Sequence, residues 1–409
     1  MNIKNKINSN YIYFAVIASN CSYSLYYETD NIIFRVISFL AVLIFYYNSF
    51  SILKKWSVVA RGDSESKLLY FNLLLTILLV AISVNLKVED IITLFTHPYS
   101  FLAFYIAIVS LTVEKDTIFK INRICRFANN IFLLIILFDF YFFKKPLLIN
   151  DLGYFLIWEL VLFDKLKFWR KIYIYSLIIF MIVVSNSYDN RTIFIRFIGV
   201  ISLLVVFKYL SFLQNKFLKL MFLTVSMVSL YFITFHFKDT FNLITGLITN
   251  KTIDTTDTRT FIFIEFFQSF KNWDWLAGKG YLGTYYSQYF YDWEGLGGDS
   301  STRFSVEIGI MHILLKGGLT LLIPFMYIFI KALRIGFVKN NLSSVSFRLA
   351  IFLLVDFVLL GIENFPAFQI HYMFIWLAIG IIFKEQFFKK NIFLHNKFNN
   401  LKNESVEVT

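Results

Sequence analysis

Long apolar runs separated by short polar segments make up most of the chain. Each run approaches the roughly 20 residues that a helix needs to cross a bilayer, or is somewhat shorter. The pattern therefore predicts an all-α polytopic integral membrane protein with about twelve transmembrane helices. The predicted spans are residues 11–27, 32–53, 68–86, 97–113, 127–143, 152–164, 172–188, 192–210, 218–236, 305–330, 346–362 and 370–387.

The pattern changes between Phe237 and Phe304, where a long segment is rich in Gly, Asp, Thr, Tyr, Trp and Asn. A bilayer tolerates irregular polar backbone only outside the hydrocarbon, or against protein and water. The segment is therefore predicted to be one long loop, and to be where the chemistry of the protein happens. The predicted organisation is a bundle over 1–236, the loop over 237–304, three spans over 305–387 and a basic tail over 388–409.

Composition supports this class. The chain is 58% hydrophobic and 16% charged, whereas a soluble domain is about 45–50% apolar and about 25% charged. The two cysteines, Cys21 and Cys125, are predicted on opposite sides of the membrane, so no disulfide framework or thiol metal site is expected. The N-terminal segment shows no clear small-residue cleavage site, and the first run is read as an uncleaved span.

The distribution of Lys and Arg predicts the orientation. With both termini cytoplasmic, most of the 39 basic residues fall in the inward loops, the adjoining span ends and the tails. The short outer loops then hold only Lys87, Lys144, Lys145 and Arg191. This asymmetry follows the positive-inside rule, so the net charge of +12 orients the protein and does not indicate nucleic-acid binding.

The orientation places the long loop on the outer face, where ATP and nucleotide sugars are not available. The chain also contains no Walker-type loop, metal-ligand cluster or nucleophile elbow. A catalytic loop in this position is expected to use a donor that has already been carried across the membrane, with no cofactor and no metal.

Two arginines open the eighth predicted span. Arg191 follows a short outer turn, and Arg196 lies about one helical turn deeper in the apolar run. An arginine at an outer helix end can form a bidentate fork with phosphate oxygens. The alternative for Arg191 is that it snorkels to lipid head groups. Burying Arg196 in lipid is costlier, so it is predicted to face the bundle interior.

Inside the long loop, Arg259 precedes an aromatic-rich segment, Phe261 to Phe270, that is predicted to be an interfacial helix. Arg259 is a candidate phosphate or sugar contact, although a capped helix with a solvated arginine explains it equally simply. Further along, Lys279 lies between Gly278 and Gly280, which suit a tight turn with close backbone approach. The neighbouring Trp and Tyr rings are read either as sugar-stacking platforms or as an aromatic belt at the membrane surface.

Four ionisable residues enter the tenth predicted span. Arg303 and Glu307 are four residues apart and share a helix face, and Lys316 lies four residues after His312. A cation beside a carboxylate or imidazole suits transfer from a lipid diphosphate, with Glu307 or His312 accepting a proton. The alternative is an Arg303–Glu307 ion pair and a hydrogen-bonded interior histidine.

Other intramembrane groups keep a different class of function open. Asp356 in the eleventh span and His371 near the last outer turn are predicted to border the same outward cavity. Asp139 and Glu159 are intramembrane carboxylates, which keep a proton-coupled transporter as an alternative.

Several segments together resemble the O-antigen polymerase (Wzy-type) and O-antigen ligase superfamily. The resemblance rests on the serine-containing turn before Arg191, the single long outer loop, Arg259-Thr-Phe261, the Gly278-Lys-Gly280 turn and the His312-Ile-Leu-Leu-Lys316 segment. It covers about residues 172 to 330. It implies that Arg191, Arg259 and His312 correspond to functional residues of that family. Asparagine often follows the family's histidine, and this chain has Ile313 there.

The resemblance implies an activity on the outer face of a bacterial cytoplasmic membrane. The expected reaction polymerises undecaprenyl-diphosphate-linked oligosaccharide repeats into O-antigen, capsular or exopolysaccharide. The alternatives are an O-antigen ligase and a polysaccharide flippase or transporter. The expected partners are the lipid-linked oligosaccharide, membrane lipid and a chain-length regulator. The candidate catalytic residues are Glu307 and His312, and the candidate substrate-binding residues are Arg191, Arg196, Arg259, Lys279, Arg303 and Lys316.

Overall fold

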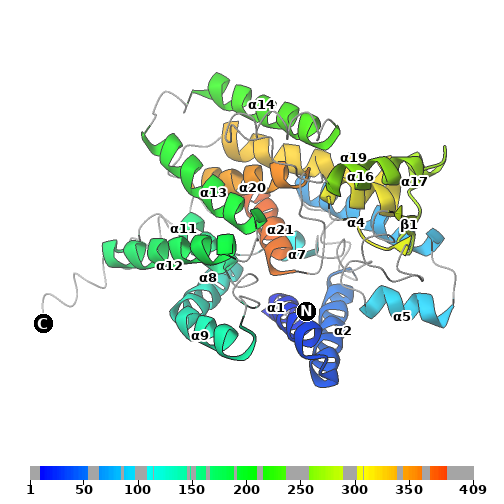
Figure 1. Cartoon of the computed structure of the whole chain (residues 1–409). Helices are drawn as coiled ribbons and strands as arrows, with labels where there is room; N and C mark the ends of the chain where they lie inside the picture. The colour runs from blue at the N-terminus through cyan, green and yellow to red at the C-terminus, as the bar shows by residue number, and fades with distance from the viewer. Residues whose placement is uncertain are drawn as a thin grey trace, which may run out of the picture.

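The computed structural model describes residues 10–53, 64–83, 87–96, 108–113, 115–144, 148, 153–162, 166–187, 191–209, 215–235, 258–288, 302–306, 308–338, 344–361 and 369–384. These residues are mostly helical, which confirms the all-α class (Figure 1). The helices are α1 (Asn10–Thr29), α2 (Ile32–Leu53), α4 (Ser64–Ser83), α5 (Val88–Thr96), α7 (Ile108–Leu111), α8 (Lys115–Asn130), α9 (Phe132–Phe142), α11 (Tyr154–Leu162), α12 (Phe168–Ser187), α13 (Arg191–Tyr209), α14 (Lys216–Phe235), α16 (Thr258–Gln268), α17 (Asp274–Ala277), α19 (Gly309–Val338), α20 (Val345–Leu359) and α21 (Ile370–Phe383). The predicted tail, 388–409, lies outside the described residues.

Among the described helices, three are long and apolar enough to cross a membrane: most of α2, α4 and α19. A fourth span is formed if α8 and α9, which meet at a bend of 53°, are counted as one. These helices support a membrane protein. The other predicted spans correspond to shorter or more polar helices, or include residues outside the described part, so the number twelve stays a prediction.

The outward faces of these helices are apolar, as expected for contact with lipid. On α4, the large apolar side chains that are exposed are Phe71, Leu74, Leu78 and Ile82, which recur every three or four residues along one face. A row of large apolar side chains at this spacing is unfavourable in water and favourable against lipid tails. The opposite face of α4 packs against the protein.

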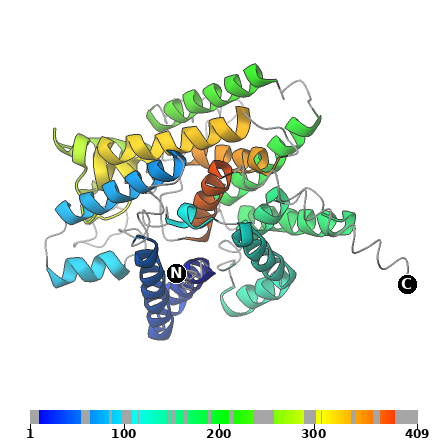
Figure 2. The ribbon, with the colours of Figure 1, turned by 180° about the vertical axis from the view of Figure 1, so that it is seen from behind.

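The core is built on α20 and α21, whose side chains are almost all buried. Both helices lie in the middle of the molecule, with α19, α13 and α11 around them (Figures 1 and 2). Trp158 of α11 stacks on Phe374 of α21, with ring centroids 4.6 Å apart. Small residues allow close helix packing: a Cβ added to Gly380 would lie 2.8 Å from the Ser110 carbonyl oxygen of α7.

Helices α1 and α2 form a hairpin that projects from the other helices in both views (Figures 1 and 2). The hydroxyls of Ser19 and Ser38 lie 3.0 Å apart and join the two helices. Asn20 connects the hairpin to the core, because its side-chain oxygen accepts a 2.7 Å hydrogen bond from the backbone N–H of Ile370. This bond satisfies one of the free N–H groups at the start of α21.

Helices α4 and α19 run antiparallel to each other. At one end, Lys331 of α19 forms a 3.2 Å ion pair with Glu65, in the first turn of α4. At the other end, Ser83 closes α4 beside Gly280 of the long loop. The two contacts therefore show which residues of α4 and α19 lie at the same level along the pair.

The long loop is described at 258–288 and 302–306, whereas 236–257 and 289–301 lie outside the described residues. The helix expected at Phe261 to Phe270 is present as α16. After the short α17, strand β1 (Tyr285–Tyr286) pairs antiparallel with β2 (Thr302–Arg303). Phe266 contacts the Tyr285 ring, and Trp275 stacks on Phe267 at an interplanar angle of 9°. The loop therefore has its own small aromatic core beside the start of α19.

Candidate functional site

The long loop meets α19 at a break in that helix. Gly318 has φ 59° and ψ −160°, which interrupts the helical backbone and bends its axis. Such a break leaves carbonyl groups without their usual helical partners, and inside a membrane they need another donor. The loop supplies one: the backbone N–H of Lys279 donates a 2.7 Å hydrogen bond to the carbonyl oxygen of Leu315.

Glycines allow the two backbones to touch. Gly278 has φ 70°, and a Cβ added there would lie 2.6 Å from the backbone nitrogen of Gly317. A Cβ added to Gly318 would lie 2.3 Å from the carbonyl oxygen of Leu276. Neither distance is possible for a real side chain. The close approach predicted at the Gly278-Lys-Gly280 turn is therefore confirmed, and the backbone that it approaches is the break in α19 at Gly317 and Gly318.

Lys316 lies directly beneath this contact, with no exposed surface. Its Nζ donates a 3.0 Å hydrogen bond to the carbonyl oxygen of Gly283 and lies 3.4 Å from the centroid of the Phe304 ring. Within the described residues, no carboxylate lies at ion-pair distance from this ammonium. A carbonyl and a ring face only partly replace the hydration of a buried cation. An anion bound beside the ammonium would offset this loss of hydration.

Two more of the predicted cations lie on the same part of the loop. The ammonium of Lys279 lies 5.8 Å from the centroid of the Phe270 ring. Partial burial lowers the pKa of this ammonium below its ordinary value, while the nearby carboxylate of Asp274 acts in the opposite direction. Arg303 is half-buried on β2, immediately before Phe304. The structure thus brings Lys279, Arg303 and Lys316 to one joint between the loop and α19.

His312 lies one helical turn before Lys316 and is completely buried. Its Nδ1 accepts a 3.4 Å hydrogen bond from the backbone N–H of Val306. A neutral imidazole that accepts at Nδ1 carries its proton on Nε2, so in this arrangement it donates rather than accepts at that atom. The prediction that Arg303 and Glu307 share a helix face is wrong, because Arg303 lies on β2, where it pairs with β1, and α19 begins only at Gly309. Glu307 lies outside the described residues, so an ion pair between the two stays a prediction.

Arg196 faces the interior, as predicted. Its Nε donates a 2.6 Å hydrogen bond to Asp356 of α20, and its guanidinium also contacts the hydroxyl and the ring of Tyr154. The Tyr154 ring stacks on His371, with centroids 5.1 Å apart. All four side chains are buried, so α11, α13, α20 and α21 share one ionic and aromatic cluster. The charge of Arg196 is matched by Asp356, and its predicted role in substrate binding stays a prediction.

The Arg196 cluster borders the start of α19. The backbone N–H of Ile310 donates a 3.1 Å hydrogen bond to the carbonyl oxygen of Leu360, one turn after Asp356. Asp356 and His371 therefore lie near the entry of α19, and the cavity expected beside them stays a prediction. Tyr154 connects Arg196 to His371. The sequence did not point to this residue, because a tyrosine at the end of a span is common.

Arg191 and Arg259 are placed only through their backbones. Arg191 is the first residue of α13, and Arg259 is the second residue of α16. Their side chains lie outside the described part of the structure, so their roles stay predictions.

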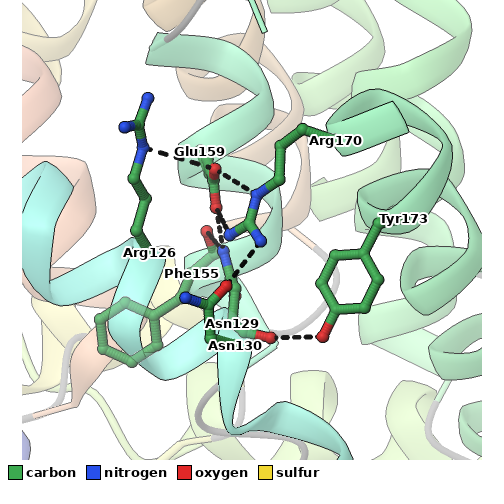
Figure 3. A network of polar contacts seen from close by, with 7 residues as sticks. All are labelled: Arg126, Asn129, Asn130, Phe155, Glu159, Arg170 and Tyr173. Atoms are coloured by element: carbon green, nitrogen blue, oxygen red, sulfur yellow. Dashed lines mark hydrogen bonds and ion pairs between the residues drawn. The ribbon is translucent and has the colours of Figure 1, made fainter. Parts of the chain in front are cut away.

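A second buried cluster surrounds Glu159 of α11. Arg170 holds this carboxylate with two hydrogen bonds, from Nε to Oε1 at 2.9 Å and from Nη2 to Oε2 at 2.8 Å. Asn129 adds a 2.7 Å hydrogen bond to Oε2, and Arg126 lies 3.8 Å from Oε1. Figure 3 shows the carboxylate enclosed between the two arginines. The carboxylate is thus held by two arginines and one amide from neighbouring helices, and the proton-coupled transporter stays an alternative.

The same cluster joins three helices. Arg170 also donates to the side-chain oxygen of Asn130 at 2.6 Å, and the hydroxyl of Tyr173 donates to the carbonyl oxygen of Asn129 at 2.7 Å (Figure 3). These bonds connect α8, α11 and α12. Nothing local in the sequence indicates this pairing, because Arg170 lies at the start of α12 and Glu159 lies inside α11.

Replacing Arg170 by lysine is expected to destabilise the protein by about 2–3 kcal/mol, because one ammonium cannot make all the charged hydrogen bonds of the planar fork. The matched control is Arg126→Lys, whose side chain is 52% exposed and lies 3.8 Å from the carboxylate. Thermal unfolding in detergent would measure both. Equal melting temperatures for the two variants would contradict the structural role of Arg170.

Among the described residues, no group of three or more His, Cys, Asp or Glu side chains is placed to hold a metal ion. No protein-family model matches the chain, and neither a curated protein nor a solved structure is significantly similar to it.

Proposed function

We propose that the protein is a membrane-embedded polymerase with about twelve spans. It would join undecaprenyl-diphosphate-linked oligosaccharide repeats on the outer face of a bacterial cytoplasmic membrane. The observation that carries the proposal is the buried ammonium of Lys316, which has no carboxylate at ion-pair distance among the described residues and lies where the loop meets α19. Together with Lys279 and Arg303, it forms a cationic joint suited to a diphosphate.

Transfer of a sugar from a lipid diphosphate needs cations at the diphosphate. An acceptor hydroxyl oxygen forms a bond to the anomeric carbon of the donor sugar, while the bond from that carbon to the diphosphate oxygen breaks. The hydroxyl proton passes to a base, and the diphosphate leaves with an additional negative charge. Cations fixed in a water-poor site stabilise this developing charge far better than they would in water.

Access to Lys316 requires a movement of the loop. The Gly283 carbonyl and the Phe304 ring cover the ammonium. A phosphate oxygen would replace the Gly283 carbonyl as the acceptor of its hydrogen bond, and a charged acceptor makes the stronger bond. The structure therefore corresponds to a closed state, and donor binding would open the contact between the loop and α19.

The division of catalytic roles follows from His312. Since its Nδ1 accepts from Val306, His312 is suited to donate from Nε2 to a substrate oxygen. Glu307 is then the candidate base for the acceptor hydroxyl. This assignment narrows the sequence-based choice, in which either residue served as base.

The contacts between distant helices agree with the predicted alternation of the spans. The predicted topology puts Tyr154, Arg196, Asp356 and His371 on the outer side, and these residues form one cluster. It puts Glu159 with Arg170, Glu65 with Lys331, and Lys384 with Leu111 and Val113 on the inner side, and each of these sets is in contact. Each of these contacts joins residues of the same predicted side.

Lys316→Met is expected to abolish long-chain polysaccharide at normal expression, because it removes the buried cation and keeps the apolar stem. The matched control is Arg334→Met, at an exposed position on the same helix, which should leave the chain-length ladder unchanged. Gel analysis of surface glycan would measure both. A normal ladder from Lys316→Met would refute the role assigned to this cation.

The glycan profile of a deletion strain separates the proposed polymerase from the ligase alternative. Loss of a polymerase leaves single-repeat product, whereas loss of a ligase leaves polymer accumulated on the lipid carrier. Lipid flipping or substrate uptake in vesicles, without glycan elongation, would favour the transporter.

A further inference from the structure

An exposed apolar turn lies beside the break in α19. Trp273 is 77% exposed, Trp275 is 38% exposed and Leu276 is 49% exposed. These three large apolar side chains belong to the four residues 273–276, in which Asp274 is the only charged residue. Water does not favour such a concentration of apolar surface on a loop.

The depth of this turn follows from the antiparallel pair of α4 and α19. Glu65 and Lys331 mark one level of the pair. Ser83, which touches Gly280, is about 27 Å above that level, and Gly318, which touches Gly278, is about 20 Å above it, at 1.5 Å per helical residue. The hydrocarbon core of a bilayer is about 30 Å thick. A membrane that covers α4 therefore also covers the turn, in the outer part of one leaflet.

The backbone N–H groups of the turn donate hydrogen bonds within the protein, as a position inside the membrane requires. The Ala277 and Gly278 N–H groups donate to the carbonyl oxygens of Trp273 and Asp274 at 3.0 and 2.8 Å, respectively. The Lys279 N–H donates to Leu315, and the Tyr281 N–H donates to the hydroxyl of Ser83 at 3.2 Å. Irregular backbone is tolerated at membrane depth when its polar groups are satisfied by protein in this way.

The flanking residues also fit an interfacial position. Lys271 and Lys279 stand on either side of the apolar residues, and long basic side chains extend toward head groups from such sites. Tryptophan is enriched at the boundary between head groups and acyl chains. On the adjoining end of α4, Ile82 is 73% exposed, so the apolar surface continues from the helix to the turn.

We propose that residues 273–276 insert into the outer leaflet, with Trp273, Trp275 and Leu276 in contact with lipid. The long loop is then re-entrant between α4 and the break in α19, instead of lying entirely outside the membrane. The inference does not rest on the proposed glycan chemistry. Its consequence is that Lys279 and Lys316 lie in the outer part of the same leaflet, below the lipid phosphates.

The test uses fluorescence quenching on the full chain in vesicles. Single cysteines replace Trp273 or Leu276 in a Cys21→Ala, Cys125→Ala background and carry an environment-sensitive dye. Gln268→Cys, exposed on α16, is the aqueous control, and Ile82→Cys is the lipid control. The vesicles contain phosphatidylcholine and phosphatidylglycerol, with a nitroxide placed either near the glycerol or at the chain end. Iodide serves as the quencher in water.

The dyes at 273 and 276 are expected to be quenched most by the nitroxide near the glycerol, and several-fold less by iodide than the dye at 268. Strong iodide quenching at 273 and 276, equal to that at 268, would overturn the inference. Protection from iodide that appears only after a soluble oligosaccharide is added would also overturn it, in favour of a sugar-binding surface. Labelled variants that elute as the unmodified protein does in size-exclusion chromatography establish that the fold is kept.

Discussion

Asp356→Ala is expected to destabilise the protein by about 3–5 kcal/mol, because it leaves the buried charge of Arg196 without its partner. The pair is short, at 2.6 Å, and Arg196 is only 2% exposed. Breaking such a pair costs more than the pair itself contributes, since one charge stays behind in an apolar interior. Thermal unfolding in detergent and the yield of monodisperse protein would measure the loss.

The control for this prediction is Asp356→Leu combined with Arg196→Met. Removing both charges together is expected to restore most of the lost stability, because well-packed apolar residues often replace a buried ion pair at little cost. The double variant also isolates function from folding. A folded double variant that still polymerises would show that Arg196 is structural, whereas a folded but inactive one would support substrate binding. Equal loss of stability in the single and double variants would contradict the ion-pair argument.

Gly318→Ala is expected to release the loop from α19 and to abolish the proposed polymerisation while the helices stay folded. The backbone of Gly318 lies in a region that only glycine occupies readily, at a cost of about 1–3 kcal/mol for other residues. The clash of the new Cβ with the Leu276 carbonyl oxygen, at 2.3 Å, adds to this cost. Limited proteolysis of the loop and the surface glycan ladder would report the two effects.

The control is Gly199→Ala, in the middle of α13. A Cβ there would lie 3.2 Å from a methyl group of Val355, which a small shift of that side chain accommodates. Its proteolysis pattern and glycan ladder are expected to match those of the unmodified protein. If Gly318→Ala behaves in the same way as Gly199→Ala, the close contact between the loop and α19 does not exist in the membrane.

The class of fold follows from the sequence because apolar runs of near-spanning length are long and numerous. Which helices face lipid does not follow, since a lipid-facing surface and a buried surface are both apolar in a membrane protein. Residues of α4 and α21 read alike, although Ile82 is 73% exposed and Ile382 is buried. The central position of α20 and α21 was therefore not predictable from periodicity.

The candidate site was also only partly predictable from the sequence. The inward orientation of Arg196 was predictable, because charge in lipid is costly. Its partner was not, since Asp356 lies 160 residues away in the sequence. Gly278 and Gly280 indicated close backbone approach, but nothing local showed that Gly278 approaches Gly317 and Gly318. Pairings between distant segments depend on the whole packing and leave no pattern in either segment.

The distance between Arg196 and Asp356 along the chain has a consequence for biosynthesis. At about 5–20 residues per second, a ribosome needs roughly 8 to 30 seconds to make the 160 residues that separate the two. During that interval, α13 is already made and its arginine has no carboxylate from α20. Tyr154 is synthesised earlier, and its hydroxyl is available from the start to accept from the guanidinium. The nascent chain therefore carries a provisional partner for this charge until the helix that neutralises it emerges.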